Sequence, residues 1–293
     1  MPTRDVLIAI AVAVVWGLVF IAIKIGVGET TPLALSALRF LFAALPLVLF
    51  VRPPQASAPL VVLYGLLIGA GQFGLLFLAV RQGFPVGLAS LVIQLQAFFT
   101  IFFAWALLGE SPRRAQTIGA AIAFAGIALI GSERLGGASL GPLMLVIAAA
   151  AFWGAGNVVA KIAGRVDMFA FVAWSSLAAP APLFLVSAWL DGPAALVPLV
   201  HPSLRLVLSV LALSYAGTIF GFGLWSRLLT RHPAAAVAPF ALLVPIVGMI
   251  AGALIFAEPL DGFELWGAVL VLAGLGVNVA GDRLLRRWLR PTG

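Results

Sequence analysis

The feature that most constrains this chain is a succession of long segments without a charged side chain. Nine segments carry no charge, and a tenth, residues 30–51, is interrupted only by Arg39. The nine uncharged segments are 6–23, 53–80, 82–109, 115–132, 135–160, 168–190, 206–226, 233–257 and 265–281. A helix needs about 20 apolar residues to cross a bilayer. The pattern therefore predicts ten membrane spans, with little chain left for a soluble domain.

The length of these segments also predicts their secondary structure. Inside a bilayer only a helix or a closed barrel satisfies every backbone hydrogen bond, and barrel strands alternate apolar with polar residues. Charged residues make up 9% of the chain, against about 25% in ordinary soluble domains, which excludes a soluble globular protein. We expect an all-α integral membrane protein with ten transmembrane helices.

Composition narrows the possible chemistry. The chain has no cysteine, and its two histidines, His201 and His232, fall outside the predicted spans or at their ends. Neither a nucleophile with its base nor a pair of carboxylates is visible. We expect no catalytic residue, no metal and no cofactor. The net charge of +7 fits anionic lipid headgroups better than nucleic acid, because basic residues mark the cytoplasmic side of a membrane protein.

Basic residues also predict the orientation. With a cytoplasmic N-terminus, twelve basic residues fall on the inside and four on the outside. The inside set is Arg4, Arg52, Arg113, Arg114, Lys161, Arg165, Arg227, Arg231, Arg283, Arg286, Arg287 and Arg290; the outside set is Lys24, Arg81, Arg134 and Arg205. Short loops follow this bias closely. We expect a multi-pass membrane protein with both termini cytoplasmic, in which residues 6–23 are a retained span rather than a cleaved signal peptide.

The chain contains an internal repeat. Trp16-Gly17 and Lys24-Ile25 recur 137 positions later as Trp153-Gly154 and Lys161-Ile162. Further along, Gly69, Pro85, Glu110, Gly119 and Gly126 recur 148 positions later as Gly217, Pro233, Glu258, Gly267 and Gly274. We divide the chain into residues 1–134 and 135–293, with five helices each. An odd number of helices per copy gives the two halves inverted topology, from which many secondary transporters build alternating access.

These motifs carry a family resemblance. The two Trp-Gly…Lys signatures, Arg39-Phe40, Leu108-Gly109-Glu110 and the glycine-rich fifth helix resemble the EamA-type, ten-helix members of the drug/metabolite transporter superfamily. Among these the chain is most similar to bacterial aromatic amino acid exporters of the YddG type. The resemblance implies a basket of helices around a central cavity lined by helices 1, 3, 4, 6, 8 and 9, and export of small organic solutes, amino acids in particular, by alternating access. It also implies a location in the bacterial inner membrane.

Polar and aromatic side chains at mid-span depth are the candidate cavity residues. They are Trp16, Gln72, Phe77, Gln94, Phe98, Trp153, Asn157, Tyr215 and Trp225. Each amide or hydroxyl could tie two helices together or bind a zwitterionic solute. Aromatic walls with amide groups suit amino acids or other small amphipathic solutes, whereas Phe99 is expected to face lipid.

Five charged residues are candidates for gating or structural roles. Lys24 and Lys161 could extend to headgroups, or act in gating or contact a substrate carboxylate. Arg39 could pair with backbone carbonyls or stabilise one conformation, and Glu110 and Glu258 could be helix caps or gate partners. Pro239 and Pro245 predict a kink that serves as a hinge in the ninth helix.

The predicted spans carry no deep histidine or carboxylate, which argues against a proton relay and favours facilitated exchange. Three alternatives remain open: a carrier for nucleotide sugars, lipid-linked sugars or drugs; a membrane-embedded enzyme; and a sensor without transport activity. The expected partners are a small-molecule substrate and the lipid bilayer, but no nucleic acid. The oligomeric state stays open, and a monomer is compatible with the sequence.

Overall fold

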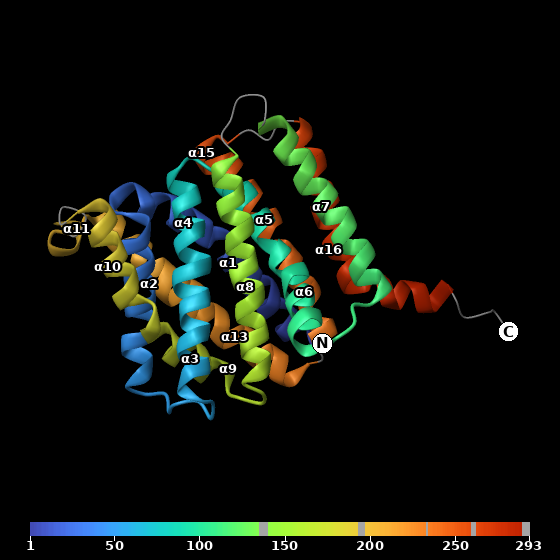
Figure 1. Ribbon diagram of the computed structural model, residues 1–293, viewed down its shortest axis with the longest axis horizontal. Coiled ribbons are helices and arrows are strands. Elements are labelled where there is room, and N and C mark those ends of the chain that lie inside the picture. Colours follow the sequence, from blue (N-terminus) through green and yellow to red (C-terminus); the bar gives the residue numbers. More distant parts are fainter. Residues whose placement is uncertain (135–139, 193–196, 233, 259–261, 289–293) are drawn as a thin grey trace.

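The computed structural model describes residues 1–134, 140–192, 197–232, 234–258 and 262–288, and every regular element within them is helical (Figure 1). Nine spans in this part are long and apolar enough to cross a membrane. The shorter apolar helix α2 (Pro32–Val48) adds a tenth. The expected all-helical, ten-span membrane fold is therefore confirmed.

The first five spans are formed by α1 to α7. They are α1 (Thr3–Glu29), α2, α3 (Ala58–Gly65) continued by the π-helical segment η1 (Leu66–Phe73) and α4 (Gly74–Arg81), α5 (Val86–Val92) continued by the 3₁₀ segment η2 (Ile93–Leu95) and α6 (Gln96–Leu108), and α7 (Arg114–Arg134).

The last five spans are formed by α8 to α16. They are α8 (Gly141–Ile162), α9 (Met168–Ser175) with the 3₁₀ segment η3 (Ser176–Ala178) and α10 (Pro180–Asp191), α12 (Leu204–Leu211) with the π-helical segment η5 (Ala212–Phe220) and α13 (Gly221–Arg231), α14 (Ala234–Val237) with the 3₁₀ segment η6 (Ala238–Leu242) and α15 (Leu243–Phe256), and α16 (Gly262–Trp288). The short α11 (Val197–Val200) precedes α12.

Irregular helical turns recur at corresponding positions of the sequence repeat. Gly69 lies in η1 and Gly217, 148 positions later, lies in η5. The fourth and ninth spans each contain a 3₁₀ segment, η2 and η6. Pro239 lies in η6 and Pro245 in the first turn of α15, so the ninth span is not one continuous α-helix. Such turns often mark functional positions in a helix, and the hinge role of the two prolines stays a prediction.

Helices α7 and α16 pack along each other through two glycine contacts (Figure 1). A Cβ on Gly119 would lie 2.5 Å from the carbonyl oxygen of Gly274, and a Cβ on Gly126 would lie 2.6 Å from that of Gly267. Only glycine permits so close an approach of two backbones. In the sequence repeat Gly119 corresponds to Gly267 and Gly126 corresponds to Gly274. Each contact therefore joins a glycine of the first half to the repeat counterpart of the other first-half glycine.

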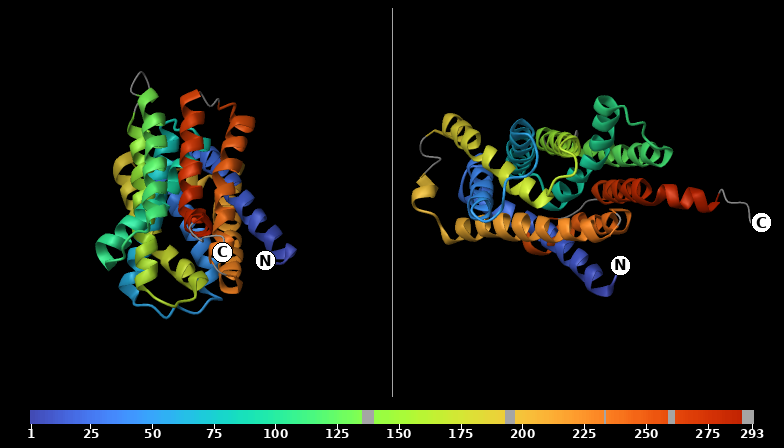
Figure 2. Two further views of the ribbon diagram at one scale, coloured as in Figure 1. Left: turned by 90° about the vertical axis from the view of Figure 1, so that its right-hand side faces the viewer. Right: turned by 90° about the horizontal axis from the view of Figure 1, so that it is seen from below.

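The two ends of the chain lie toward the same end of the helix bundle. Figure 2 shows Met1 and the C-terminal end of α16 there, as an even number of membrane spans requires. The main core cluster joins α1, α4, α5, α8 and α15, and α5 is buried along its whole length. This packed core lies beside a large internal cavity.

Candidate functional site

The central feature is a cavity of about 1010 Å³ between the spans. Its lining includes Asp167 and Phe169 at the start of α9 and Leu229 near the end of α13. These positions lie at the end of the bundle that carries the N-terminus, so the cavity reaches that end. In the opposite direction its lining stops at residues such as Ile23 and Leu76, both almost fully buried. The structure therefore has one open and one closed end.

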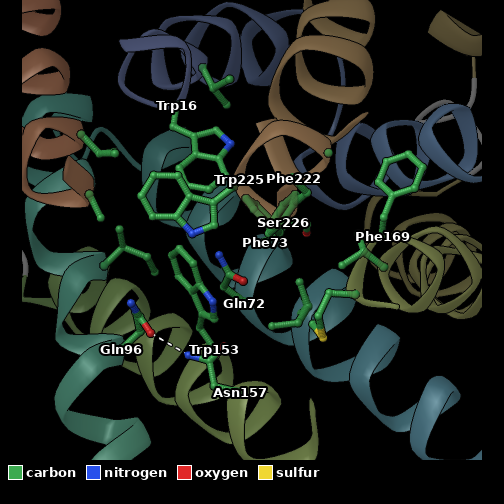
Figure 3. Close-up of a pocket in the computed structure, with 18 of the residues that line it drawn as sticks. Trp16, Gln72, Phe73, Gln96, Trp153, Asn157, Phe169, Phe222, Trp225 and Ser226 are labelled. Carbon is green, nitrogen blue, oxygen red and sulfur yellow. Dashed lines mark hydrogen bonds between the residues drawn. The ribbon is translucent and has the colours of Figure 1, made fainter. Parts of the chain in front are cut away.

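Aromatic rings form one wall of the cavity. The ring of Trp16 lies 5.4 Å from that of Phe222 and 5.1 Å from that of Trp225, between centroids (Figure 3). Trp16 Nε1 donates a hydrogen bond of 2.9 Å to the carbonyl oxygen of Gly217 in η5. This bond fixes the orientation of the indole. The result is a rigid apolar surface that spans α1 and α13.

Amide groups form the opposite wall. Asn157 Nδ2 donates to Gln96 Oε1 at 2.7 Å and to Thr100 Oγ1 at 3.0 Å (Figure 3). These bonds tie α8 to α6, so Asn157 has the helix-joining contacts that were one of its two predicted roles. Gln72 is 1% exposed, and its Oε1 accepts no hydrogen bond from the described residues. Gln72 thus lines the cavity with an Oε1 that is buried and unpaired within the described part of the chain.

Six of the nine predicted cavity residues lie in the lining. They are Trp16, Gln72, Gln94, Trp153, Asn157 and Trp225. The other three lie elsewhere, which corrects their prediction. Phe77 is fully buried in the core next to Phe73, Phe98 is buried against Phe124, and Tyr215 is 39% exposed on the outer side of η5. All three lie within candidate spans, but they are absent from the cavity lining.

Phe99 is partly exposed, and its expected position facing lipid stays a prediction. A Cβ on Gly154 would lie 2.6 Å from the Cβ of Phe99, and the Phe99 ring lies beside those of Phe103 and Phe124. Phe222 and Ser226 line the cavity and were not predicted. Their spacing could have indicated them, since Phe222, Trp225 and Ser226 share one helical face.

Four of the five candidate charges form two ion pairs. Lys24 Nζ pairs with Glu258 Oε1 and lies 4.3 Å from the centroid of the Phe256 ring. Glu258 Oε2 also accepts a bond of 3.4 Å from the backbone N–H of Gly87. Lys161 Nζ pairs with Glu110 Oε2. The first pair lies at the closed end, and the second lies at the open end with both side chains about half exposed.

The fifth charge, Arg39, is buried at 3% exposure. Its Nη2 donates a long bond of 3.4 Å to Thr218 Oγ1, and its Cζ lies 3.7 Å from the centroid of the Phe73 ring. The guanidinium donates to no backbone carbonyl of the described residues. This corrects one of its two predicted roles.

A ten-span bundle with a solute-sized internal cavity defines the class of multi-pass membrane transporters. The chain belongs to the EamA-like transporter family, whose model matches residues 3–132 and again 140–280.

Several known proteins are similar along most or all of the chain. A protein of Salmonella typhimurium named "Probable amino-acid metabolite efflux pump" is 40% identical over 300 residues and covers 100% of both chains. The protein of the same name from Escherichia coli K12 is 40% identical over 290 residues, 97% of each chain. The "Uncharacterized inner membrane transporter YedA" of E. coli is 28% identical over 89% of this chain and 86% of its own. A solved crystal structure with 23% identity covers both chains completely and has a TM-score of 0.65, which supports the fold.

Proposed function

We propose that this transporter exports amino acids and related small metabolites from the cytoplasm by alternating access. The observation that carries the proposal is the cavity, whose wall joins Trp16, Trp153 and Trp225 to the amides of Gln72 and Gln94. Its volume of about 1010 Å³ admits a small organic solute, since such sites span roughly 300–1,000 Å³. The names of the two relatives at 40% identity point to the same class of solute.

The orientation suits export. The excess of basic residues supports a cytoplasmic location for both termini, and the cavity reaches the end of the bundle that carries the N-terminus. In this orientation the open cavity faces the cytoplasm and loads its solute there. The closed end then faces outward and is held by the Lys24–Glu258 pair and by a 2.8 Å bond from Arg81 Nη1 to the carbonyl oxygen of Val27.

The outward-open conformation is proposed to arise from a rearrangement of the two halves, residues 1–134 and 135–293. As inverted repeats, they can exchange conformations so that the closed end opens while the open end closes. The paired recurrence of η1 with η5 and of Gly119 with Gly267 supports this division. Pro239 and Pro245 are the proposed hinge of the ninth span.

Movement of the solute is proposed to follow its own gradient. Among the described lining residues, the acidic side chain is Asp167, and its Oδ1 accepts bonds from Phe169 N and Ala170 N at the start of α9. A carboxylate used as a helix cap at the mouth is poorly placed to carry protons through the cavity. Facilitated exchange needs no such carrier.

Efflux from proteoliposomes tests the proposal. Liposomes containing the purified protein are loaded with one labelled solute at a time: phenylalanine, threonine, a nucleotide sugar or a cationic dye. We expect protein-dependent efflux of the amino acids, with protein-free liposomes as the control. Efflux of the nucleotide sugar or the dye without efflux of any amino acid would contradict it.

A further inference from the structure

Arg39 is a buried cation that the fold leaves largely unpaired. It lies midway along α2 and is 3% exposed. No carboxylate of the described residues forms an ion pair with it, and its Nε and Nη1 donate to none of these residues. An unpaired charge at this depth is costly, and ionisable groups inside membrane proteins generally belong to a substrate pathway.

The contacts that Arg39 does make leave its donors free. The guanidinium lies over the Phe73 ring at 3.7 Å and near the Phe40 ring at 5.4 Å. A ring face stabilises the charge of a guanidinium but does not use its in-plane N–H groups. The single bond to Thr218 Oγ1, at 3.4 Å, engages one of five N–H donors. The site therefore holds a buried cation whose Nε and Nη1 find no acceptor among the described residues.

Arg39 also lies where the two halves of the repeat meet. Its counterpart 137 positions later is Ser176, and both residues line one small pocket of about 10 Å³ next to the main cavity. Arg39 lines the main cavity as well. A side chain where two inverted halves meet can stay beside a solute in both conformations. Because the counterpart of Arg39 is the uncharged Ser176, the site contains one arginine and not two.

Gln72 complements this cation from the neighbouring span. It precedes Phe73 in the chain, lines the same cavity, and its Oε1 is a buried acceptor without a donor among the described residues. Beside the cavity, Arg39 thus has two buried donor atoms and Gln72 has one buried acceptor atom that find no partner among the described residues. A molecule that carries both a carboxylate and an ammonium group supplies the missing partner of each.

We infer that Arg39 binds the carboxylate of the transported solute and that Gln72 Oε1 accepts a hydrogen bond from its ammonium group. This inference rests on the proposed export of amino acids and assigns its specificity: solutes need a free carboxylate. Methyl esters, amides and decarboxylated amines of the same side chain are rejected.

The test combines ligand binding with transport. Binding is measured in detergent as the rise in melting temperature on addition of phenylalanine, phenylalanine amide or phenethylamine. We expect the wild type to prefer phenylalanine. In Arg39→Gln the affinity for phenylalanine should fall about 10- to 100-fold, the loss expected for a charge-assisted hydrogen-bonded pair. The affinity of Arg39→Gln for phenylalanine amide should not fall. The variant should therefore lose the preference for phenylalanine over its amide.

Matched variants separate this role from a structural one. Arg205→Gln removes an arginine that is 78% exposed at the opposite end of the bundle from the mouth, and it should keep the preference for phenylalanine. Arg39→Lys keeps the charge and should retain part of the preference if Arg39→Gln fails to fold. Equal binding of acid and amide by the wild type, or an unchanged preference in Arg39→Gln, would overturn the inference.

The two proposals can fail separately. If labelled phenylalanine leaves proteoliposomes but phenylalanine amide competes equally well, the proposed function stands and the role of Arg39 is wrong. If no amino acid moves, but other carboxylate solutes such as benzoate stabilise the wild type and not Arg39→Gln, the role of Arg39 stands and the proposed solute class is wrong.

Discussion

Lys24, near the end of α1, forms an ion pair with Glu258, two residues beyond the end of α15, at the closed end of the cavity. Lys161 and Glu110 form the corresponding pair at the open end. Each pair joins a lysine of one half to a glutamate of the other. The pairs therefore connect the halves at opposite ends of the bundle, where alternating access needs contacts that form and break.

Loss of the Lys24–Glu258 pair should open the closed end more often. The pair is partly exposed, at 35% and 11% for the two side chains, and such a pair stabilises by about 1 kcal/mol, equivalent to about a fivefold change in population. In Lys24→Gln, a cysteine introduced at Phe20 in the cavity should react faster with an impermeant thiol reagent from the outer side.

Two controls accompany this measurement. Lys161→Gln should not accelerate outer labelling, because its pair lies at the other end. The exchanged double variant Lys24→Glu with Glu258→Lys should return labelling toward the wild-type rate. Unchanged labelling in Lys24→Gln would show that the pair does not hold this end closed.

The α7–α16 contact should be sensitive to any side chain at its glycines. A Cβ on Gly126 would lie 2.6 Å from the carbonyl oxygen of Gly267, and overpacking of this kind costs about 1–3 kcal/mol. Gly126→Val should lower the melting temperature in detergent. Gly276→Val on α16 is the control, because no atom lies within 4 Å of a Cβ there. Equal melting temperatures would contradict the packing.

Replacing Trp153 by alanine should mainly affect transport, whereas replacing Asn157 by alanine should mainly affect stability. Trp153→Ala removes an aromatic wall of the cavity and should reduce transport about tenfold with little change in melting temperature. Asn157→Ala leaves Gln96 Oε1 and Thr100 Oγ1 without their shared donor and should lower the melting temperature, by the equivalent of about 1 kcal/mol.

Phe102→Ala is the lipid-facing control, because the Phe102 side chain is 51% exposed. This variant should change neither the transport rate nor the melting temperature. A stable Asn157→Ala protein with abolished transport would assign Asn157 to the solute instead of to the helix contact.

The sequence predicts the spans well because solvation by lipid depends mainly on composition along the chain. It predicts the cavity residues less well because depth in a span does not define the face on which a residue lies. Phe77 follows η1, Phe98 follows η2, and Tyr215 lies within η5. A π or 3₁₀ turn changes the rotation per residue, so the helical phase cannot be extrapolated through it from sequence alone.

The ion pairs show a second limit. Lys24 and Glu258 are separated by 234 positions, and nothing local in either segment indicates the other. The repeat carries the only sequence signal, since a lysine and a glutamate recur together in both halves. That signal indicates equivalent residues, but which glutamate each lysine meets depends on how the halves pack.

The proposed orientation predicts opposite accessibility for two glutamines at the ends of the third span. Gln55 precedes α3 and Gln82 follows α4, and both are exposed. Since the chain has no native cysteine, Gln55→Cys and Gln82→Cys each provide a single reactive thiol. An impermeant reagent added to intact spheroplasts should label Gln82→Cys and spare Gln55→Cys. The reverse pattern would place both termini outside.

Counterflow across proteoliposomes tests most directly the claim that the protein is an alternating-access carrier of amino acids. Vesicles loaded with unlabelled phenylalanine are diluted into a trace of labelled phenylalanine, with and without an imposed pH gradient and a protonophore. We predict a transient accumulation of label that depends on the internal amino acid and is unchanged by the gradient or the protonophore. No accumulation, or uphill accumulation that requires the pH gradient and collapses with the protonophore, would contradict the account.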